Sequence, residues 1–503
     1  MRFQNSILFI CLWLISIVGY AQKDRGYFQR LNQQYDPVRQ EKEVLFSNPA
    51  FMSGYSIYSF SDFDAGYGQH KKKTYLLQEG NQSKGIQVKG SSFKRLKNNS
   101  VLWGEVVYQD KQHKGVQWNS SLDLDYIGPY VLADSTKGTN KYESYAFMGG
   151  VAKQVSNWRF GAEMSYKAQM AHRDRDPRPK ATTSDLKLKA GIAYNLYKDI
   201  EIGTFAELTS YKQSTDVKFF NQTGRASLYQ MTGLGEYSFY FSNKTQDAHY
   251  NYNGIHTGVS IVSHEDIDFG LVGYFTHGKL DKQVSSQYDI NRLENKQWSI
   301  DAFKGFTIGR HRLLAHVVFS FFKREGTDIL YTNIDTNLDK LMERKAYKKS
   351  IDYSEFSVMY QWEGQRDFVS FKPFYIYQKE QESMLLLDRN QSFTYGVIGG
   401  MGEYRRMLSS KSVLTLSTSV QHRAIIQANN QLNTDLMKPS IGQWLESDYL
   451  LKSSNCISSN LSVRYDHQLA SKLGLYTLVE YQQEKYSEFP VNQYMGVRLG
   501  ITF

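Results

Sequence analysis

The sequence predicts an all-β protein: a transmembrane, antiparallel, up-and-down β-barrel of about 18 strands, within a range of about 14–20. Two observations predict this class. Segments of about ten residues alternate apolar with polar or small side chains, and the connections between them are alternately short and long. Strands of a transmembrane barrel face lipid on one side and the lumen on the other. Short periplasmic turns and longer outer loops join them.

The composition excludes several other classes. The 503 residues include 37 Tyr and 37 Gly but only 8 Pro, and 15% of them are aromatic. The mean hydropathy of −0.52 excludes a helical membrane bundle. The even spread of aromatic residues excludes a disordered or collagen-like chain. A soluble β-sandwich also alternates apolar and polar residues, but it gives no reason for short and long connections to alternate.

Residues 1–21 predict a secretory signal peptide. Arg2 supplies the positive charge, residues 7–19 are apolar, and Gly19-Tyr20-Ala21 offers small residues for cleavage. The mature chain would keep one cysteine, Cys456, so we expect no intramolecular disulfide and no metal site built from cysteines. Export of a barrel predicts location in a bacterial outer membrane.

The remaining chain divides into a short N-terminal segment, 22–54, which we expect in the periplasm or the lumen, and the barrel, 55–503. In the last segment Val497, Leu499 and Ile501 alternate with polar or small residues up to the terminal Phe503. We expect Phe503 to mark barrel closure, because an open strand edge in lipid leaves backbone groups unpaired. The predicted strands lie near 55–67, 84–96, 99–110, 142–156, 158–172, 181–196, 199–214, 245–263, 266–281, 293–308, 311–324, 349–362, 367–382, 390–407, 411–427, 450–467, 471–485 and 490–503.

Charged residues on the polar side of the strands are expected to line the lumen. A charge facing lipid at the bilayer centre would cost about 2–4 kcal/mol. Two interpretations stay open: a hydrated pathway of mixed-sign selectivity, or a cross-strand ion-pair network that stiffens a closed barrel. The candidates are Arg159, Glu163, Lys167, Lys187, Lys189, Glu201, Glu207, Asp266, Asp268, Arg464, Asp466, Glu480 and Arg498.

The predicted outer loops carry two further patterns. Basic residues gather at 71–73, 173–180 and 344–349, where they are either solvated or in contact with lipopolysaccharide phosphates. Aromatic residues within 217–241 indicate either a lid folded into the barrel mouth or a docking surface for a partner. The basic residues are too dispersed for nucleic-acid binding.

No catalytic motif stands out. The 11 histidines are scattered, and neither His-Glu-x-x-His nor Gly-x-Ser-x-Gly occurs. His264-Glu265-Asp266 falls at a short turn, where capping is the simpler role. We therefore expect no enzyme activity, no cofactor and no metal.

Residues Ser47-Asn48-Pro49-Ala50 resemble the start of FadL-type fatty-acid transporters and of barrels from Bacteroidota gliding and secretion systems. With Gly128-Pro129-Tyr130, Asp176-Pro177-Arg178-Pro179 and Phe503, the chain resembles uncharacterised outer-membrane barrels of Bacteroidota. That resemblance implies no activity residue by residue. TonB-dependent receptors are disfavoured, because about 33 residues before the barrel cannot form their much larger plug.

The leading hypothesis is a passive channel or transporter for a small solute or an amphiphile. The alternative is a non-conducting surface receptor, or a secretion or motility barrel, that acts through its outer loops; a barrel enzyme comes third. Expected partners are outer-membrane lipid, lipopolysaccharide and the barrel assembly machinery.

Overall fold

The computed structural model describes residues 26–503, except 57, 198, 222, 224, 264–267, 335–336 and 471. The predicted signal peptide and the predicted luminal residue Asp266 lie outside the described residues.

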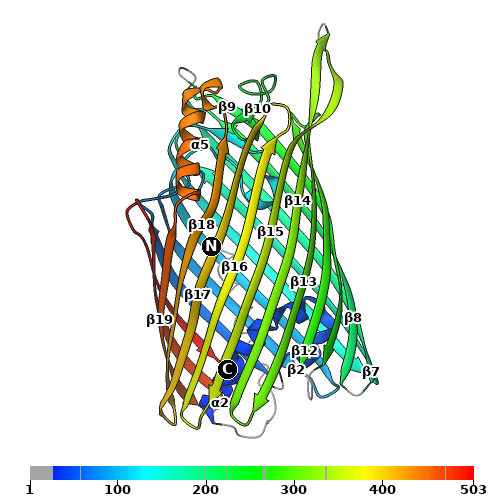
Figure 1. Ribbon diagram of the computed structural model, residues 1–503, viewed down its shortest axis with the longest axis vertical. Helices are drawn as coiled ribbons and strands as arrows, with labels where there is room; N and C mark the ends of the chain where they lie inside the picture. Colours follow the sequence, from blue (N-terminus) through cyan, green and yellow to red (C-terminus); the bar gives the residue numbers. More distant parts are fainter. Residues whose placement is uncertain are drawn as a thin grey trace, which may run out of the picture.

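Eighteen antiparallel strands form one closed barrel, which confirms the predicted fold class (Figure 1). Each strand pairs with its neighbours along the chain, and the last strand pairs with the first: Leu499 lies opposite Ala65. The Phe503 amide donates to Ser61 at 3.0 Å and continues this closure to the last residue. The strands are β1(Phe60–Lys71), β2(Gln82–Arg95), β3(Ser100–Val116), β5(Gly138–Val155), β6(Trp158–Arg173), β7(Arg178–Tyr197), β8(Ile200–Lys218), β11(Asp247–Ser263), β12(Phe269–Val284), β13(Tyr288–Ile308), β14(His311–Ile334), β15(Asn337–Glu363), β16(Asp367–Met384), β17(Arg389–Ser409), β18(Ser412–Gln431), β19(Cys456–Ala470), β20(Leu473–Tyr486) and β21(Asn492–Thr502).

The predicted strands overlap all eighteen observed ones. The first begins at Phe60 and not at 55, at its inner end, and 450–452 belong to a helix and not to the strand predicted at 450–467; most other differences lie at the outer ends. The largest difference is the β14–β15 hairpin, where residues expected in a long loop, 325–348, continue the ladder beyond Thr327↔Lys345. This hairpin projects past the rest of the barrel (Figure 1). The run from Ile329 to Thr332 is rich in β-branched, aromatic and aliphatic residues, which favour strands over loops.

The outer surface of the barrel carries a belt of exposed apolar side chains. Trp298, Ile398 and Leu499 are 61%, 64% and 61% exposed, whereas Arg498, between exposed neighbours, pairs with a carboxylate on the other face. Only lipid can cover such a belt, so the protein spans the bacterial outer membrane. Among the described residues, no helix is long and apolar enough to cross a bilayer.

Residues 26–56, here called the inner plug, lie inside the barrel at the end with the short turns (Figure 1). They form α2(Tyr27–Gln34), α3(Pro37–Glu41) and the 3₁₀ helices η1(Glu43–Ser47) and η2(Pro49–Gly54). Asp36 accepts a hydrogen bond from the Val38 amide at 3.1 Å and caps α3. Asn48 caps η2 in the same way, and a proline follows each cap at the first helical position.

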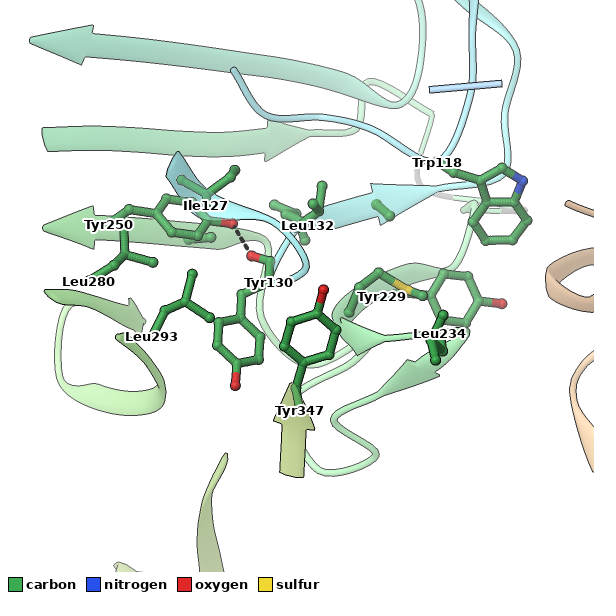
Figure 2. Close-up of a cluster of buried hydrophobic side chains, with 14 of the residues drawn as sticks. Trp118, Ile127, Tyr130, Leu132, Tyr229, Leu234, Tyr250, Leu280, Leu293 and Tyr347 are labelled. Carbon is green, nitrogen blue, oxygen red and sulfur yellow. Dashed lines mark hydrogen bonds between the residues drawn. The ribbon is translucent and has the colours of Figure 1, made fainter. Parts of the chain in front are cut away.

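Three outer connections, 117–137, 219–246 and 432–455, fold over the opposite end of the barrel and are called the outer plug. They contain α4(Leu124–Ile127), α5(Pro439–Lys452), η3(Thr434–Leu436) and a small sheet of β4(Leu132–Asp134), β9(Leu228–Gly233) and β10(Glu236–Tyr237). Their side chains share one buried cluster with the barrel wall, in which Tyr130, Leu132 and Tyr250 meet (Figure 2).

The aromatic residues within 217–241 divide between the two predicted roles. Phe241 is 3% exposed in a small cluster with Val284 and Ile290, as a lid would require. Phe220 and Phe239 are 81% and 89% exposed.

Candidate functional site

The Asn-Pro-Ala motif fastens the inner plug to the barrel wall. Asn48 donates from Nδ2 to the carbonyl oxygens of Ile192 on β7 and Thr204 on β8, both at 3.2 Å. Its Oδ1 accepts from the Ala50 amide at 3.0 Å. Asn48 and Ala50 are 1% and 0% exposed, so these hydrogen bonds satisfy polar groups that water does not reach.

Three glycines on β6, β7 and β8 make room for this motif. A Cβ atom at Gly161 would lie 2.2 Å from the Pro49 carbonyl carbon, and one at Gly191 would lie 2.0 Å from Asn48 Oδ1. At Gly203 the Asn48 Nδ2 would be 2.7 Å away. The close approach of the plug to the wall backbone, by its own backbone at Gly161 and by the Asn48 side chain at Gly191 and Gly203, therefore favours glycine at these wall positions.

Ion pairs hold the middle of the inner plug. Lys42 Nζ lies 2.5 Å from Asp268 on the wall, and Asp36 lies 3.1 Å from Arg312 on β14. Lys372 Nζ of β16 donates a hydrogen bond to Glu41 Oε1 at 2.9 Å. The same Nζ lies 2.7 Å from Glu41 Oε2.

His316 on β14 extends the Glu41 contact into the wall. Its Nδ1 lies 3.4 Å from Glu41, and its Nε2 lies 2.8 Å from Asp301 of β13. The carboxylate of the plug and the carboxylate of the wall thus share one imidazole, which links the plug to β13 and β14; Lys372 adds β16.

Arg405 on β17 clamps the end of α2. Its guanidinium donates to the carbonyl oxygens of Leu31 (3.5 Å) and Tyr35 and to Asn32 Oδ1 (3.3 Å). Carbonyls at a helix C-terminus lack intrahelical partners and carry partial negative charge, so a buried cation stabilises them. Arg405 is 2% exposed.

The Tyr35 side chain is held between polar groups of two strands, β1 and β19. Its hydroxyl donates to Asp62 of β1 at 2.5 Å and accepts from Arg464 of β19 at 3.0 Å. The Arg464 guanidinium lies 4.3 Å from the Tyr35 ring centroid and 3.6 Å from that of Tyr476 on β20.

Together these contacts join the inner plug to strands on all sides of the barrel. In the remaining sectors the plug packs in hydrophobic clusters with β2, β3 and β5, with β11 to β15, and with β16 and β18. The wall members of those clusters are Phe93, Val101, Trp103, Ala152, Ala193, Val262, Val272, Phe303, Leu314, Met359, Phe368 and Val413. The inner plug therefore contacts the barrel wall on all sides of the lumen.

The structure pairs most of the predicted luminal charges with one another or with a plug. Asp268 binds Lys42 of the inner plug, and Lys167 binds Asp123 of the outer plug at 3.1 Å. The wall pairs are Arg159–Glu201 (2.6 Å), Lys189–Glu163 (3.5 Å), Lys189–Glu207 (3.0 Å), Arg464–Asp466 (2.8 Å) and Arg498–Glu480 (2.7 Å). This geometry favours the ion-pair network over a row of free charges. Lys187 lies on the same face of β7, two positions before Lys189.

A second wall arginine holds the outer plug as Arg405 holds the inner one. Arg324 on β14 donates to the carbonyl oxygens of Asp125 and Gly128 (2.7 Å), at the end of α4, and to Asn295 Oδ1 at 2.8 Å. On the opposite side, Arg173 lies 3.5 Å from Asp134. Burial raises the pKa of the Asp134 carboxyl, and Arg173 opposes that effect.

Two cavities lie beside the outer plug. One of about 170 Å³ is lined by Tyr126, Tyr252, Phe322 and Arg324, among others. The other, of about 290 Å³, lies between 78–83 and 119–124 and is flanked by His70 and His113.

One hydrogen-bonded chain resembles a catalytic triad in composition. Ser214 Oγ lies 3.0 Å from His249 Nδ1, and His249 Nε2 lies 3.1 Å from Asp247. Ser214 and His249 are directly opposite in the β8–β11 ladder, so their contact is a cross-strand pair of the kind that stabilises sheets. Within the described part of the chain, no three His, Cys, Asp or Glu side chains are grouped to hold a metal.

Sequence reasoning missed Arg312, His316, Lys372 and Arg405, the wall residues that bind the inner plug. The signal was present: each lies on the inner face of its strand by the same alternation that identified Arg159 or Glu201. Around residues 313–322 both faces are apolar, and Pro373 interrupts the pattern beside Lys372, so the alternation does not identify the inner face there.

Residues 49–503 match the profile of a family described as a family of unknown function, DUF6850. The chain belongs to DUF6850. No curated protein matches it.

Several solved outer-membrane receptors are similar to this DUF6850 chain at low identity. The siderophore receptor PiuA from Acinetobacter baumannii is 8% identical with a TM-score of 0.42, over 88% of this chain and 82% of that one. BauA, the ferric preacinetobactin receptor of the same organism, is 8% identical with a TM-score of 0.41, over 89% and 80%. The ferric-catecholate import receptor Fiu from E. coli K12 is 7% identical with a TM-score of 0.42, over 89% and 82%. The resemblance to FadL-type transporters and to Bacteroidota barrels stays a prediction.

Proposed function

We propose that this protein is a gated transporter for a small hydrophilic solute, in which the inner plug is the gate. The observation that supports the proposal is the set of contacts between the inner plug and the barrel wall. The plug contacts the wall on all sides, yet its roughly 30 residues have no core of their own. Beside three small hydrophobic clusters shared with the wall, hydrogen bonds and ion pairs to a few wall residues fasten it. Such contacts can be exchanged for water, so the plug can leave the wall without unfolding the barrel.

The chemistry of the lumen supports a hydrophilic solute. On β18, β19 and β20 the inner face carries hydroxyl and amide groups, in the rows Ser417–Ser462 and Ser419–Asn460–Gln482. Gln421 and Asn460 are exposed although they share this inner face, so solvent reaches them. An amphiphile would need an apolar lining instead.

A surface receptor that does not conduct is the second candidate. The exposed tips Phe220 and Phe239 and the projecting β14–β15 hairpin favour it, because these groups are available to a partner outside the cell. The Ser214–His249–Asp247 contact is a cross-strand pair, so it gives no support to a catalytic alternative.

Flux through proteoliposomes tests the proposal. The variant Asp36→Asn/Glu41→Gln removes two carboxylates that bind the wall, and Glu480→Gln is the matched control, because Glu480 pairs only within the wall with Arg498. We expect liposomes with the double variant to swell in a neutral monosaccharide several times faster than wild type or control. A double variant that admits a fatty acid but no sugar, or neither, would contradict the proposed transport.

A further inference from the structure

The lipid-facing side of β12, β13 and β14 changes abruptly from aromatic to basic at its outer end. Phe275, Trp298 and Phe321 form the last apolar row; Trp298 and Phe321 are 61% and 55% exposed, and the Phe275 and Trp298 ring centroids are 4.3 Å apart. Aromatic rows of this kind mark the membrane interface. The row directly outside it therefore lies among lipid headgroups.

That next row brings two ammonium groups face to face. Lys296 on β13 and Lys323 on β14 are direct partners in the ladder, with side chains 48% and 49% exposed, and His277 on β12 is the other partner of Lys296. Like charges directly opposite destabilise a sheet unless an anion lies between them.

The surrounding charges leave this surface positive. Glu294 and Glu325 lie one row further out, at 3.0 Å from Lys296 and 2.5 Å from Lys323. Three more lysines flank these two glutamates: Lys279 is opposite Glu294, Lys348 is opposite Glu325, and Lys345 lies 3.3 Å from Glu325. On β15 the exposed Asp352 lies opposite Phe321, and Lys379 of β16 is its other partner. Six lysines thus face three carboxylates.

The structure assigns this surface, the lipid-phosphate site, to the phosphate groups of an outer-leaflet glycolipid of the lipid A type. Phosphate oxygens accept charge-assisted hydrogen bonds from Lys296 and Lys323, and the acyl chains lie over Phe275, Trp298 and Phe321. Neither the gate nor the solute enters this inference, which rests on the position of the barrel in the outer membrane.

The corresponding surface on β3 and β5 has the same arrangement with acidic residues in place of the lysines. There the last aromatic row is Tyr108 and Tyr145, with ring centroids 5.0 Å apart, and the next row outward is Asp110 directly opposite Glu143. The geometry is the same but the charge is reversed, so this side repels lipid phosphate. We infer that glycolipid phosphates are held on the β12–β14 side of the barrel and not on the β3–β5 side.

Titration of the full-length protein in detergent tests the assignment. The probes are bisphosphorylated lipid A, the same lipid with its phosphates removed, and inorganic phosphate; native mass spectrometry measures the bound fraction. The test variant is Lys296→Gln/Lys323→Gln, and Asp110→Asn/Glu143→Gln is its matched control. Heat-modifiable gel mobility shows that each variant is folded.

We expect wild type and the Asp110→Asn/Glu143→Gln control to bind bisphosphorylated lipid A alike, and the lysine variant to bind it at least tenfold more weakly. Equal binding by the lysine variant would overturn the assignment, as would equal binding of the dephosphorylated lipid. Displacement of lipid A by inorganic phosphate at equal concentration would also overturn it, since the ligand would then be free phosphate.

Discussion

The inner plug contacts the wall through three small hydrophobic clusters and a set of charged groups, whereas the outer plug shares one large aromatic cluster with it. Both are clamped by a buried wall arginine at the end of a short helix: Arg405 at α2 and Arg324 at α4. The two plugs differ in the contacts that remain when the arginine is removed: a large aromatic cluster in the outer plug, and small hydrophobic clusters and ion pairs in the inner one. Apolar burial is not weakened by added salt, whereas salt screens partly exposed ion pairs. The comparison supports our proposal that the inner plug, and not the outer one, is the part that moves.

The largest effect is expected from Trp444→Ala in the outer plug. Trp444 of α5 stacks on Trp118, with ring centroids 5.2 Å apart, at the point where α5 joins the aromatic cluster. Truncating a buried tryptophan costs about 3–5 kcal/mol. Hydrogen exchange should show protection lost over 117–134 and 439–452 with the inner plug unchanged. Leu450→Ala, 57% exposed on the same helix, is the control and should change little.

The next largest effect is expected from Arg405→Ala in the inner plug. The substitution leaves the carbonyls of Leu31 and Tyr35 and the Glu403 carboxylate, 2.5 Å from Arg405, without their cation. Losing a buried charged partner costs roughly 3 kcal/mol. Exchange over 27–36 should rise at least tenfold. Arg406→Ala removes a neighbouring arginine with a 57% exposed side chain and should leave that exchange unaltered; a similar rise there would show that the clamp is not specific.

A smaller effect is expected from salt, which should change hydrogen exchange in the inner plug more than in the outer plug. The Lys42–Asp268 pair has side chains 15% and 20% exposed, and the Arg312–Asp36 pair 36% and 19%, so ions screen them in part. Raising sodium chloride from about 0.1 to 1 M, which shortens the Debye length from about 10 to 3 Å, should speed exchange in 36–43 several-fold. Exchange over 228–233 of the outer plug should stay the same or slow. An equal change of exchange in both plugs would contradict the claim that ion pairs matter more for the inner plug.

The smallest effect is a pH dependence of α5. Burial raises the pKa of Asp448 from 3.8 to about 6, and Trp444 donates to its Oδ2 at 2.8 Å. The folded carboxyl then holds its proton more tightly than the unfolded one, so α5 docking is strongest at acidic pH and weakens as pH rises from 4 through 6. Protection of 439–452 should be greater at pH 5 than at pH 7.5. Asp448→Asn should abolish that difference; if it persists, another group titrates.

The barrel could be predicted from the sequence because alternation along one strand is a local pattern. Val497, Leu499 and Ile501 face lipid whatever the rest of the chain does, and the inward charges Arg159 and Glu201 follow from the same rule. The plugs could not be predicted in this way. The contacts of Arg405 with Leu31 and of Asn48 with Thr204 join residues far apart in sequence, and they depend on which strands meet around a closed circle.

Single-channel conductance in a planar bilayer tests the central claim most directly. With the inner plug in place, wild type should give no stable open steps at low voltage, and Glu480→Gln should behave in the same way. Asp36→Asn/Glu41→Gln should give stable open steps, because its plug leaves the wall. Open steps of equal size and frequency in wild type and the double variant would contradict the account, since the inner plug would then not close the lumen.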